Sequence, residues 1–439
     1  GENEIVPGIM YTVYQDGFWS TPNDLQVGQT GNIFRPAIAV DHLGNIHLTC
    51  SGKRYWQARV ESAHSANAWY RHVLDKGISY MSDVAVDSEG TVHVAYERWV
   101  MLEEPITRTV GNDVVGLADI FYRRSSDGGH TWSPPLNLSR SANVGSYREQ
   151  LQVDAHDVIH VTWDEGWDKT SRYGEPRESV YLFSTDGGQS WSEPTVFSQP
   201  ETTNAQAAVA SDNQGGVLIV WRTVSTDTID SLFYTWSTDN AQTWSSPTNI
   251  PDIYARSYND TFFDAYDMAA DSAGHIHLAA VGRSQPSMHR ADRVPLGVYH
   301  LVWDGASWSA PDPIAVYTEE EGFPEYPKIT VSQGNRLHTV WFVRDEQFGG
   351  EHYRIFYSSG LSTAPHQAPA PIPTITPMPS PTPTSLPPST STPLPTLVAD
   401  TNRSPQGLYT ESDEVWRLTI ALSPIILLLL FIAVVRSRR

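Results

Sequence analysis

Short stretches of alternating apolar and polar residues recur along the chain, each interrupted at its centre by a polar turn that carries Asp, Gly or Asn. Alternation with a period of two is typical of β-strands, and such turn residues favour a hairpin. The stretches lie roughly 45 to 70 residues apart, a spacing typical of repeated propeller blades. They are AIAVDHLGNIHL (37–48), DVAVDSEGTVHV (83–94), QLQVDAHDVIHV (150–161), AVASDNQGGVLIV (208–220), DMAADSAGHIHL (267–278) and KITVSQGNRLHTV (328–340).

A second repeat lies out of phase with the first and has the form S-x-D-x-G-x-T-W. It reads SSDGGHTWS, STDGGQSWS and STDNAQTWS from Ser125, Ser184 and Ser237, with weaker copies WDGASWS from Trp303 and QDGFWS from Gln15. In this turn Ser and Asp side chains can bond backbone amides, glycine can adopt positive φ, and the Trp can pack between neighbouring sheets. We therefore interpret it as the turn between the two outer strands of each blade.

These repeats also bear on metal binding, because Asp127 and His130 resemble ligands. The equivalent positions of other copies hold Gln189 and Gln242, so a structural turn is favoured. A further set of histidines occurs once per repeat at one register, which keeps them apart and favours a role in the core: His47, His93, His160, His277 and His338. We expect no metal and no cofactor.

Together the repeats predict an all-β fold, a six-bladed β-propeller over residues 1–364. Six inner strand pairs are present, but the turn copy nearest the N-terminus precedes the first of them. We therefore expect the segment near Asp16 to Leu25 to pair into the last blade, which contains Thr339 to Phe342. Such a closure joins the two ends of the domain and leaves no open sheet edge.

The rest of the chain has a different composition. Residues 365–417 begin with a stretch rich in Pro, Ser and Thr, and no Asp, Glu, Lys or Arg occurs from Pro365 to Ala399, which indicates an extended disordered stalk. Residues 418–435 are an uncharged apolar run long enough for one transmembrane helix, and the basic tail 436–439 favours a cytoplasmic C-terminus. The sequence thus predicts a single-pass protein of the cell membrane with an extracellular propeller. Its start at Gly1 fits a signal peptide already removed.

Charge and cysteine content narrow the possible partners. The formal net charge is −21, and almost all of it lies before the apolar run, so nucleic acid is a poor partner for the propeller. The chain has one cysteine, Cys50, so an internal disulfide is impossible and the compartment cannot be read from cysteine. The oligomeric state stays open.

Candidate chemistry lies on the face opposite the S-x-D-x-G-x-T-W turns, where inner strands start and second strands end; we call this face the mouth. Residues here vary from blade to blade, unlike the repeats. The aligned strand starts are Arg35, Met81, Arg148, Gln206, Ala265 and Tyr326, followed two residues later by Ala37, Asp83, Gln150, Ala208, Asp267 and Lys328. The second strands add Arg54, Glu97, Arg98, Asp164, Glu165, Arg222, Arg283 and Arg344. Variation within a symmetric frame suggests a site, and a solvated rim of ion pairs is the alternative.

The S-x-D-x-G-x-T-W turns resemble the Asp-boxes (BNR repeats) of the sialidase superfamily, whose catalytic domain is a six-bladed propeller. FRPAI at Phe34 resembles the family's arginine motif, although isoleucine is missing between Arg35 and Pro36. EYPKI at Glu325 resembles the stretch around the family's tyrosine, but proline and lysine follow Tyr326 where small polar residues are usual.

The resemblance implies roles for particular residues. Tyr326 would be the nucleophile, with Asp83 as acid/base and Glu165 as the partner of the tyrosine. A guanidinium fork matches a carboxylate, so the arginines that would bind the substrate carboxylate are Arg35, Arg148, Arg222 and Arg283.

Three functions are consistent with these residues. The propeller recognises an extracellular glycan or glycoprotein at its mouth, or it is an active exo-α-sialidase that retains configuration through Tyr326, or it is a scaffold for protein interactions. The same fold supports all three functions, so the arrangement of side chains at the mouth is needed to distinguish them.

Overall fold

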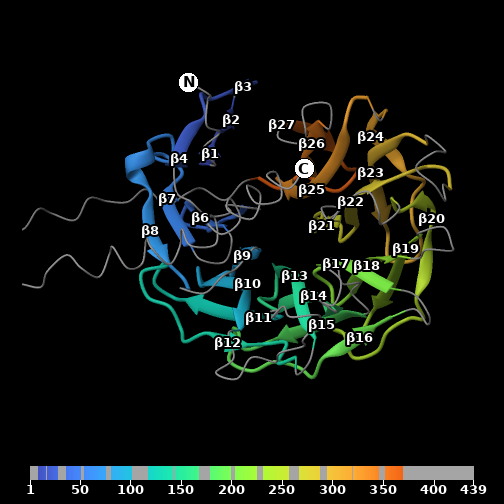
Figure 1. The fold of residues 1–439 in the computed structure, drawn as a ribbon, viewed down its shortest axis with the longest axis horizontal. Helices are drawn as coiled ribbons and strands as arrows, with labels where there is room; N and C mark the ends of the chain where they lie inside the picture. Colours follow the sequence, from blue (N-terminus) through green and yellow to red (C-terminus); the bar gives the residue numbers. More distant parts are fainter. Residues whose placement is uncertain are drawn as a thin grey trace, which may run out of the picture. The chain divides into compact units, whose positions relative to one another are not determined.

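The structure, a computed structural model, is an all-β propeller of six blades (Figure 1). It describes residues 8–15, 17–27, 36–50, 54–75, 81–100, 117–141, 144–167, 178–198, 203–224, 231–256, 266–286, 294–318, 320–345 and 352–368. Its elements are strands apart from a short 3₁₀ helix, η1 (Ala66–Ala68). The expected stalk, apolar helix and basic tail lie outside the described residues.

Each blade is an antiparallel sheet whose strands follow one another in chain order. The first three blades contain β5 (Ala37–Val40), β6 (Asn45–Cys50), β7 (Arg54–Arg59) and β8 (Tyr70–Val73); β9 (Ser82–Val86), β10 (Val92–Val100), β11 (Leu117–Ser125) and β12 (Leu136–Asn137); and β13 (Gly145–Val153), β14 (Ile159–Trp167), β15 (Glu178–Ser184) and β16 (Thr195–Phe197). The last three contain β17 (Thr203–Ser211), β18 (Val217–Val224), β19 (Ser231–Ser237) and β20 (Thr248–Tyr254); β21 (Tyr266–Ala270), β22 (Ile276–Gly282), β23 (Leu296–Trp303) and β24 (Asp312–Tyr317); and β25 (Phe323–Ser332), β26 (Arg336–Asp345) and β27 (His352–Leu361). All six inner hairpins expected from the alternating repeats are confirmed.

The core lies between successive blades. Inner strands contact in the order β5, β9, β13, β17, β21 and β25, and one apolar cluster joins Leu218 and Leu232 of the fourth blade to Leu278 and Leu301 of the fifth. The apolar faces of neighbouring sheets are thus removed from water together, which is the main stabilisation available to this fold.

The N-terminal segment differs from its expected pairing. β1 (Gly8–Tyr11) pairs with β4 (Asn23–Val27), and β2 (Tyr14–Gln15) pairs with β3 (Phe18–Trp19). The sixth sheet has three strands within the described part of the chain. The prediction that the segment near Asp16 to Leu25 would pair into the blade of Thr339–Phe342 is therefore wrong.

Side chains of this N-terminal segment, instead of its backbone, join the first and sixth blades. Ile9 and Leu25 belong to the apolar cluster of the first blade. The ring of Trp19 lies 5.4 Å from that of Tyr357 on β27, as the Asp-box residue Trp132 lies 4.9 Å from Tyr55 of the preceding blade. The weak turn copy QDGFWS thus places Trp19 against the sixth blade as Trp132 packs against the first, and this contact requires no added strand. Figure 1 shows the segment between β7 and β27.

The Asp-box turns have the structural role expected of them. Ser125 Oγ donates to Asp127 and accepts the Gly129 amide at 2.8 Å, Asp127 accepts the Thr131 amide at 2.8 Å, and the Trp132 indole donates to Gly129 O. Hydrogen bonds from Thr131 and Ser125 lower the pKa of Asp127 below its usual range. Gly129 has φ +91°, and a Cβ there would meet the Tyr55 ring at 2.1 Å, so the position requires glycine.

The repeated histidines are core groups. His47 bonds Tyr55 Oη at 2.5 Å and Asp41, the first residue of the inner turn, at 3.2 Å. His93 and His160 make the same pair of contacts in the next two blades, with Tyr122 and Asp87 and with Tyr181 and Asp154. In these three blades the histidine thus joins the inner turn to the third strand. In the described residues, no three His, Cys, Asp or Glu side chains gather as metal ligands.

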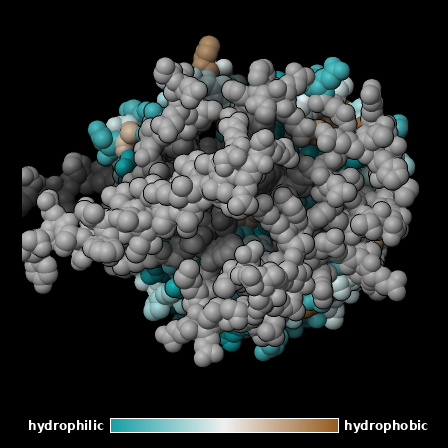
Figure 2. All heavy atoms as spheres, viewed as in Figure 1, coloured by the Kyte–Doolittle hydropathy of each residue, from teal (hydrophilic) through white to brown (hydrophobic). Residues whose placement is uncertain are grey.

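The part of the surface that the structure describes is mostly polar at the edge of the propeller (Figure 2). In Figure 2, which keeps the view of Figure 1, the described residues seen around the edge are mostly hydrophilic. A search of the described residues finds no helix of the length and apolar character that a membrane span requires.

Candidate functional site at the propeller mouth

Three inner strands carry the same irregularity at the mouth. β13, β17 and β25 each contain a one-residue bulge near their start, and the first bulged residue has positive φ: Arg148 (58°), Gln206 (60°) and Tyr326 (52°). Positive φ strains a residue that has a Cβ, by roughly 1–3 kcal/mol, and bulges of this kind re-aim side chains beside functional sites. The three residues are among the strand starts aligned from the sequence, so that alignment gave their register correctly.

Carboxylates of the preceding blade hold two of these bulges. Glu97 Oε1 on β10 accepts the backbone amide of Arg148 at 2.9 Å, and Asp164 Oδ1 on β14 accepts that of Gln206 at 2.7 Å. Asp164 also pairs with the Arg148 guanidinium at 3.2 Å. Complete burial raises the pKa of Asp164 to about 6, although Arg148 and the backbone amides oppose this rise.

Gln206 has a buried side-chain acceptor at the bulge of β17. The residue is 5% exposed, and its side-chain oxygen Oε1 finds no hydrogen-bond partner among the residues that the structure describes. A buried amide oxygen without a partner costs free energy, so such a group calls for an explanation, and a bound ligand is one.

A buried carboxylate, Glu325, organises the arginines beside Tyr326. Arg344 donates to Glu325 Oε1 through Nη2 at 2.9 Å and through Nε at 3.2 Å, and Arg256 Nη2 lies 3.7 Å from the same oxygen. The side chains of Arg256 and Glu325 have no exposed surface. Arg222 adds to this group by donating to the backbone carbonyl of Arg256. The cluster fixes the strand segment that carries Tyr326.

Tyr326 itself has a cation over its ring. The Lys328 ammonium lies 5.4 Å from the ring centroid and 3.4 Å from Asp267 Oδ1. Burial disfavours the charged ammonium, but the carboxylate of Asp267 outweighs burial and the pKa of Lys328 is raised. Lys328 is therefore a fixed positive charge beside the phenol.

Asp83 and Glu165 each accept hydrogen bonds from nearby backbone or side-chain groups. Asp83 Oδ2 accepts the amide of Leu151 in the next blade at 3.1 Å, and Asp267 accepts that of Ile329 in the same way at 2.8 Å. Glu165 is bonded by Ser141, by Ser146 at 2.7 Å and by the Trp163 indole at 2.7 Å. Burial raises the pKa of Glu165 in spite of these donors.

The arginines expected to bind a carboxylate are distributed over the mouth. Arg148 pairs with Asp164, Arg222 is buried at Arg256, and Arg283 donates through Nε to Val294 O at 3.2 Å on the wall of a cavity between the fifth and sixth blades. Arg35 lies outside the described residues.

Several residues of this site have weak or no sequence signal. Arg344 and Lys328 were visible in the aligned strand positions, but Arg256 follows β20 outside every repeat, and Glu325 precedes the aligned position by one residue. Only their mutual contacts identify them. Chemically, the described part of the mouth offers guanidinium and ammonium donors, an amide acceptor and the phenol of Tyr326, a set suited to binding a polyhydroxylated or acidic ligand.

Comparison with known proteins places this geometry in context. A family model described as a BNR repeat-like domain matches residues 45–339. Among curated proteins, none matches the sequence.

Similar solved structures include a protein of unknown function from Dyadobacter fermentans, at 16% identity and TM-score 0.48, covering 74% of this chain and 93% of that one. The NanB sialidase of Streptococcus pneumoniae is similar at 11% identity and TM-score 0.47, covering 76% and 68%. The α-L-arabinanase of Penicillium chrysogenum with arabinobiose is similar at 14% identity and TM-score 0.48, covering 75% and 93%.

Proposed function

The chain belongs to the family of BNR repeat-like domains, and from this premise we propose that its propeller recognises an extracellular glycan at the mouth. The observation that carries the proposal is the shared bulge at Arg148, Gln206 and Tyr326. Strain repeated at one register in three blades, and supported from the neighbouring blade by Glu97 and Asp164, is costly for a merely solvated rim.

The charges at the mouth favour an acidic sugar. The Arg148 guanidinium and the Lys328 ammonium are charged donors on two of the bulged strands, and each is held in place by a carboxylate, Asp164 or Asp267. Donors fixed before the ligand arrives lose little entropy on binding. The resemblance of the sequence to sialidases supports the same class of ligand, a glycan that ends in a sugar carboxylate.

Hydrolysis of such a glycan is the second candidate function, and the Tyr326–Lys328 contact favours it. An ammonium near a phenol stabilises the phenolate, which is the nucleophilic form. A tyrosine also approaches an anionic sugar without the repulsion that a carboxylate nucleophile would meet. Recognition stands first because Glu165, the expected partner of the tyrosine, is held by Ser141, Ser146 and Trp163.

Binding to α2,3-sialyllactose, measured by calorimetry on the purified full chain, tests the proposal. Gln206→Ala removes the amide acceptor, so affinity should fall about tenfold, the loss expected for one or two hydrogen bonds. Gln214→Ala, an exposed change in the inner turn of the same blade, is the matched control and should bind as the parent does. Binding unaffected by Gln206→Ala would argue against the mouth, and absence of binding in the parent would leave the scaffold function.

A fluorogenic sialoside assay on the same samples separates the enzyme from the binding protein. If the chain hydrolyses the sialoside, Tyr326→Phe should lower kcat by a hundredfold or more, on the order expected for loss of a nucleophile, with little change in binding. Turnover that survives Tyr326→Phe would exclude that role for Tyr326.

We further propose that the stalk and the apolar run 418–435 tether this propeller to the outside of the cell. Protease added to intact cells should then release a soluble propeller by cutting between Pro365 and Val398. Protection of that segment in intact cells, with cleavage only after lysis, would indicate the opposite orientation.

A further inference from the structure

A cavity of about 370 Å³ lies between the fifth and sixth blades. Its walls come from the end of β22, the start of β23, the end of β24 and the start of β25. All four of these strand ends belong to the mouth side of the propeller, so the cavity opens beside the site proposed above. Its volume is within the range of small-ligand pockets.

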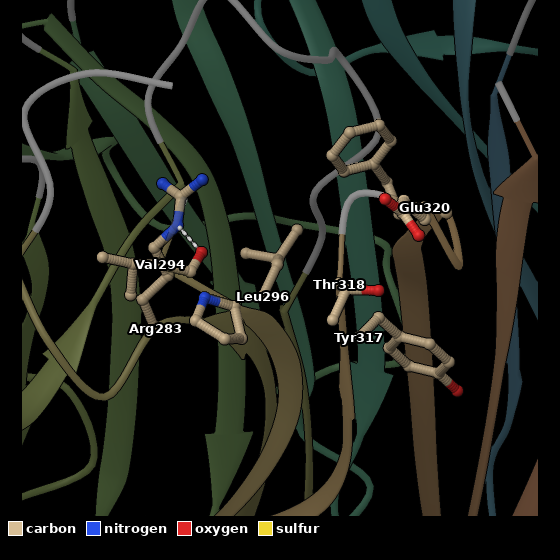
Figure 3. Close-up of a pocket in the computed structure, with 9 residues that line it drawn as sticks. Arg283, Val294, Leu296, Tyr317, Thr318 and Glu320 are labelled. Carbon is tan, nitrogen blue, oxygen red and sulfur yellow. Dashed lines mark hydrogen bonds between the residues drawn. The ribbon is translucent and has the colours of Figure 1, made fainter. Parts of the chain in front are cut away.

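The two walls of the cavity carry groups of opposite charge. Arg283, 5% exposed and held through its Nε by Val294 O, lies on one wall, and Glu320 and Thr318 lie on the other (Figure 3). Leu296 and Phe323 are buried and add apolar surface to the lining. A pyranose presents hydroxyls at its edge and C–H groups on its faces, so donors, acceptors and apolar surface in one small cavity fit a sugar unit.

The cavity is continuous with the bulged strand. Phe323, which lines it, stands three residues before Tyr326 on β25, a span of about 10 Å at the rise of an extended strand. The Phe323 ring also faces the Arg256 guanidinium, 5.7 Å away, which belongs to the Glu325 cluster. One ligand can therefore contact the cavity and the surroundings of Tyr326 together.

We infer that this cavity is a second carbohydrate subsite, which takes a neutral sugar unit of a glycan whose acidic end lies at the mouth near Tyr326. The inference rests on the proposed function and adds to it a preference for oligosaccharides over single sugars. Arg283 and Glu320 would bind the hydroxyls of the second unit, and Arg283 would then contribute to specificity without clamping the terminal carboxylate.

The test compares two probes on the full chain, the methyl α-glycoside of sialic acid and the trisaccharide α2,3-sialyllactose. The parent should bind the trisaccharide about tenfold more tightly, because only it reaches the cavity. Thr318→Trp fills the cavity from an exposed position, so affinity for the trisaccharide should fall to that for the monosaccharide. Thr248→Trp places the same bulk on an exposed residue at the start of β20, away from the mouth, and should leave both affinities unchanged.

The outcomes separate the subsite from the proposed function. Equal affinity of the parent for the two probes, or a trisaccharide preference that survives Thr318→Trp, overturns the subsite and leaves the proposed function standing. A parent that binds neither probe overturns the proposed function and the subsite with it. A second variant, Arg283→Lys, keeps the charge but loses the planar fork, and it should reduce the trisaccharide preference alone.

Discussion

Glu325→Gln should be among the most destabilising single changes in the propeller, lowering the free energy of unfolding by about 3 kcal/mol. The reason is that Glu325 neutralises two arginines, Arg344 at 2.9 Å and the fully buried Arg256 at 3.7 Å. An amide fills the same space but removes the negative charge that Arg344 and Arg256 contact, and breaking a buried ion pair is costly. Urea titration followed by tryptophan fluorescence measures the change.

Glu193→Gln is the matched control, since Glu193 is exposed beside the second Asp-box. It should alter stability by no more than about 0.5 kcal/mol. A Glu325→Gln variant as stable as this control would show that Glu325 does not hold the arginines together. Their position beside Tyr326 would then need another explanation.

Acid should unfold the propeller well above the pH at which ordinary surface carboxylates titrate. Burial lowers the pKa of His47, His277 and His338, and it lowers that of His300 to about 4. A group whose pKa is depressed in the folded state stabilises it fully above the unfolded value, near 6.5 for histidine, and this stability is lost as the pH falls. Melting temperature should therefore be flat from about pH 7 to 8 and fall below about pH 6.5.

Asp41 and Asp271, the first residues of their inner turns, should add to the loss of stability at lower pH. Burial alone would raise the pKa of Asp41 and of Asp271, but hydrogen bonds and the neighbouring histidine outweigh burial, and the pKa of both carboxyls is lowered. The stability that these two groups contribute is therefore lost as they are protonated. Asp164, with its pKa raised to about 6, acts in the opposite direction, as do Asp119, Glu165 and Asp267, whose pKa is raised by burial. The four histidines and two turn aspartates with a lowered pKa outnumber these four carboxyls, so their combined contribution should be the larger.

A substitution isolates the contribution of the histidines. His47→Gln removes the buried imidazole between Asp41 and Tyr55, so the variant should be less stable at pH 7.5 but lose less stability between pH 7 and 5. His156→Gln, at an exposed position, should keep the parent's profile. An unchanged slope in His47→Gln would refute the role of this histidine in the pH response.

The sequence predicts the blades well because their determinants are local. Alternation, D-x-x-G turns and Asp-boxes each specify hairpins within about a dozen residues, and the resulting register correctly aligned Arg148, Gln206 and Tyr326. The positive φ of these residues was not predictable, since none of them is glycine and two of the three bulges are held by carboxylates of the preceding blade.

The features that the sequence did not predict depend on contacts between segments that are distant in the chain. Arg256 and Glu325 are 69 residues apart and meet only through the packing of three blades, so no spacing rule identifies them. The N-terminal segment carried a recognisable turn copy, but that motif does not determine whether Trp19 joins the sixth blade by backbone pairing or by its ring. The turn residues determine that a hairpin forms, whereas the blade against which the hairpin packs is determined by the apolar surface that this blade exposes.

The central claim is that a glycan binds at the bulged strand starts of the mouth, and a crystal structure of the chain soaked with α2,3-sialyllactose tests it most directly. We expect the terminal sugar within hydrogen-bond distance of Arg148, Gln206 or Tyr326 and the next sugar toward the cavity of Arg283. A sugar found only on the Asp-box face, or an unoccupied mouth at saturating ligand, would contradict the claim.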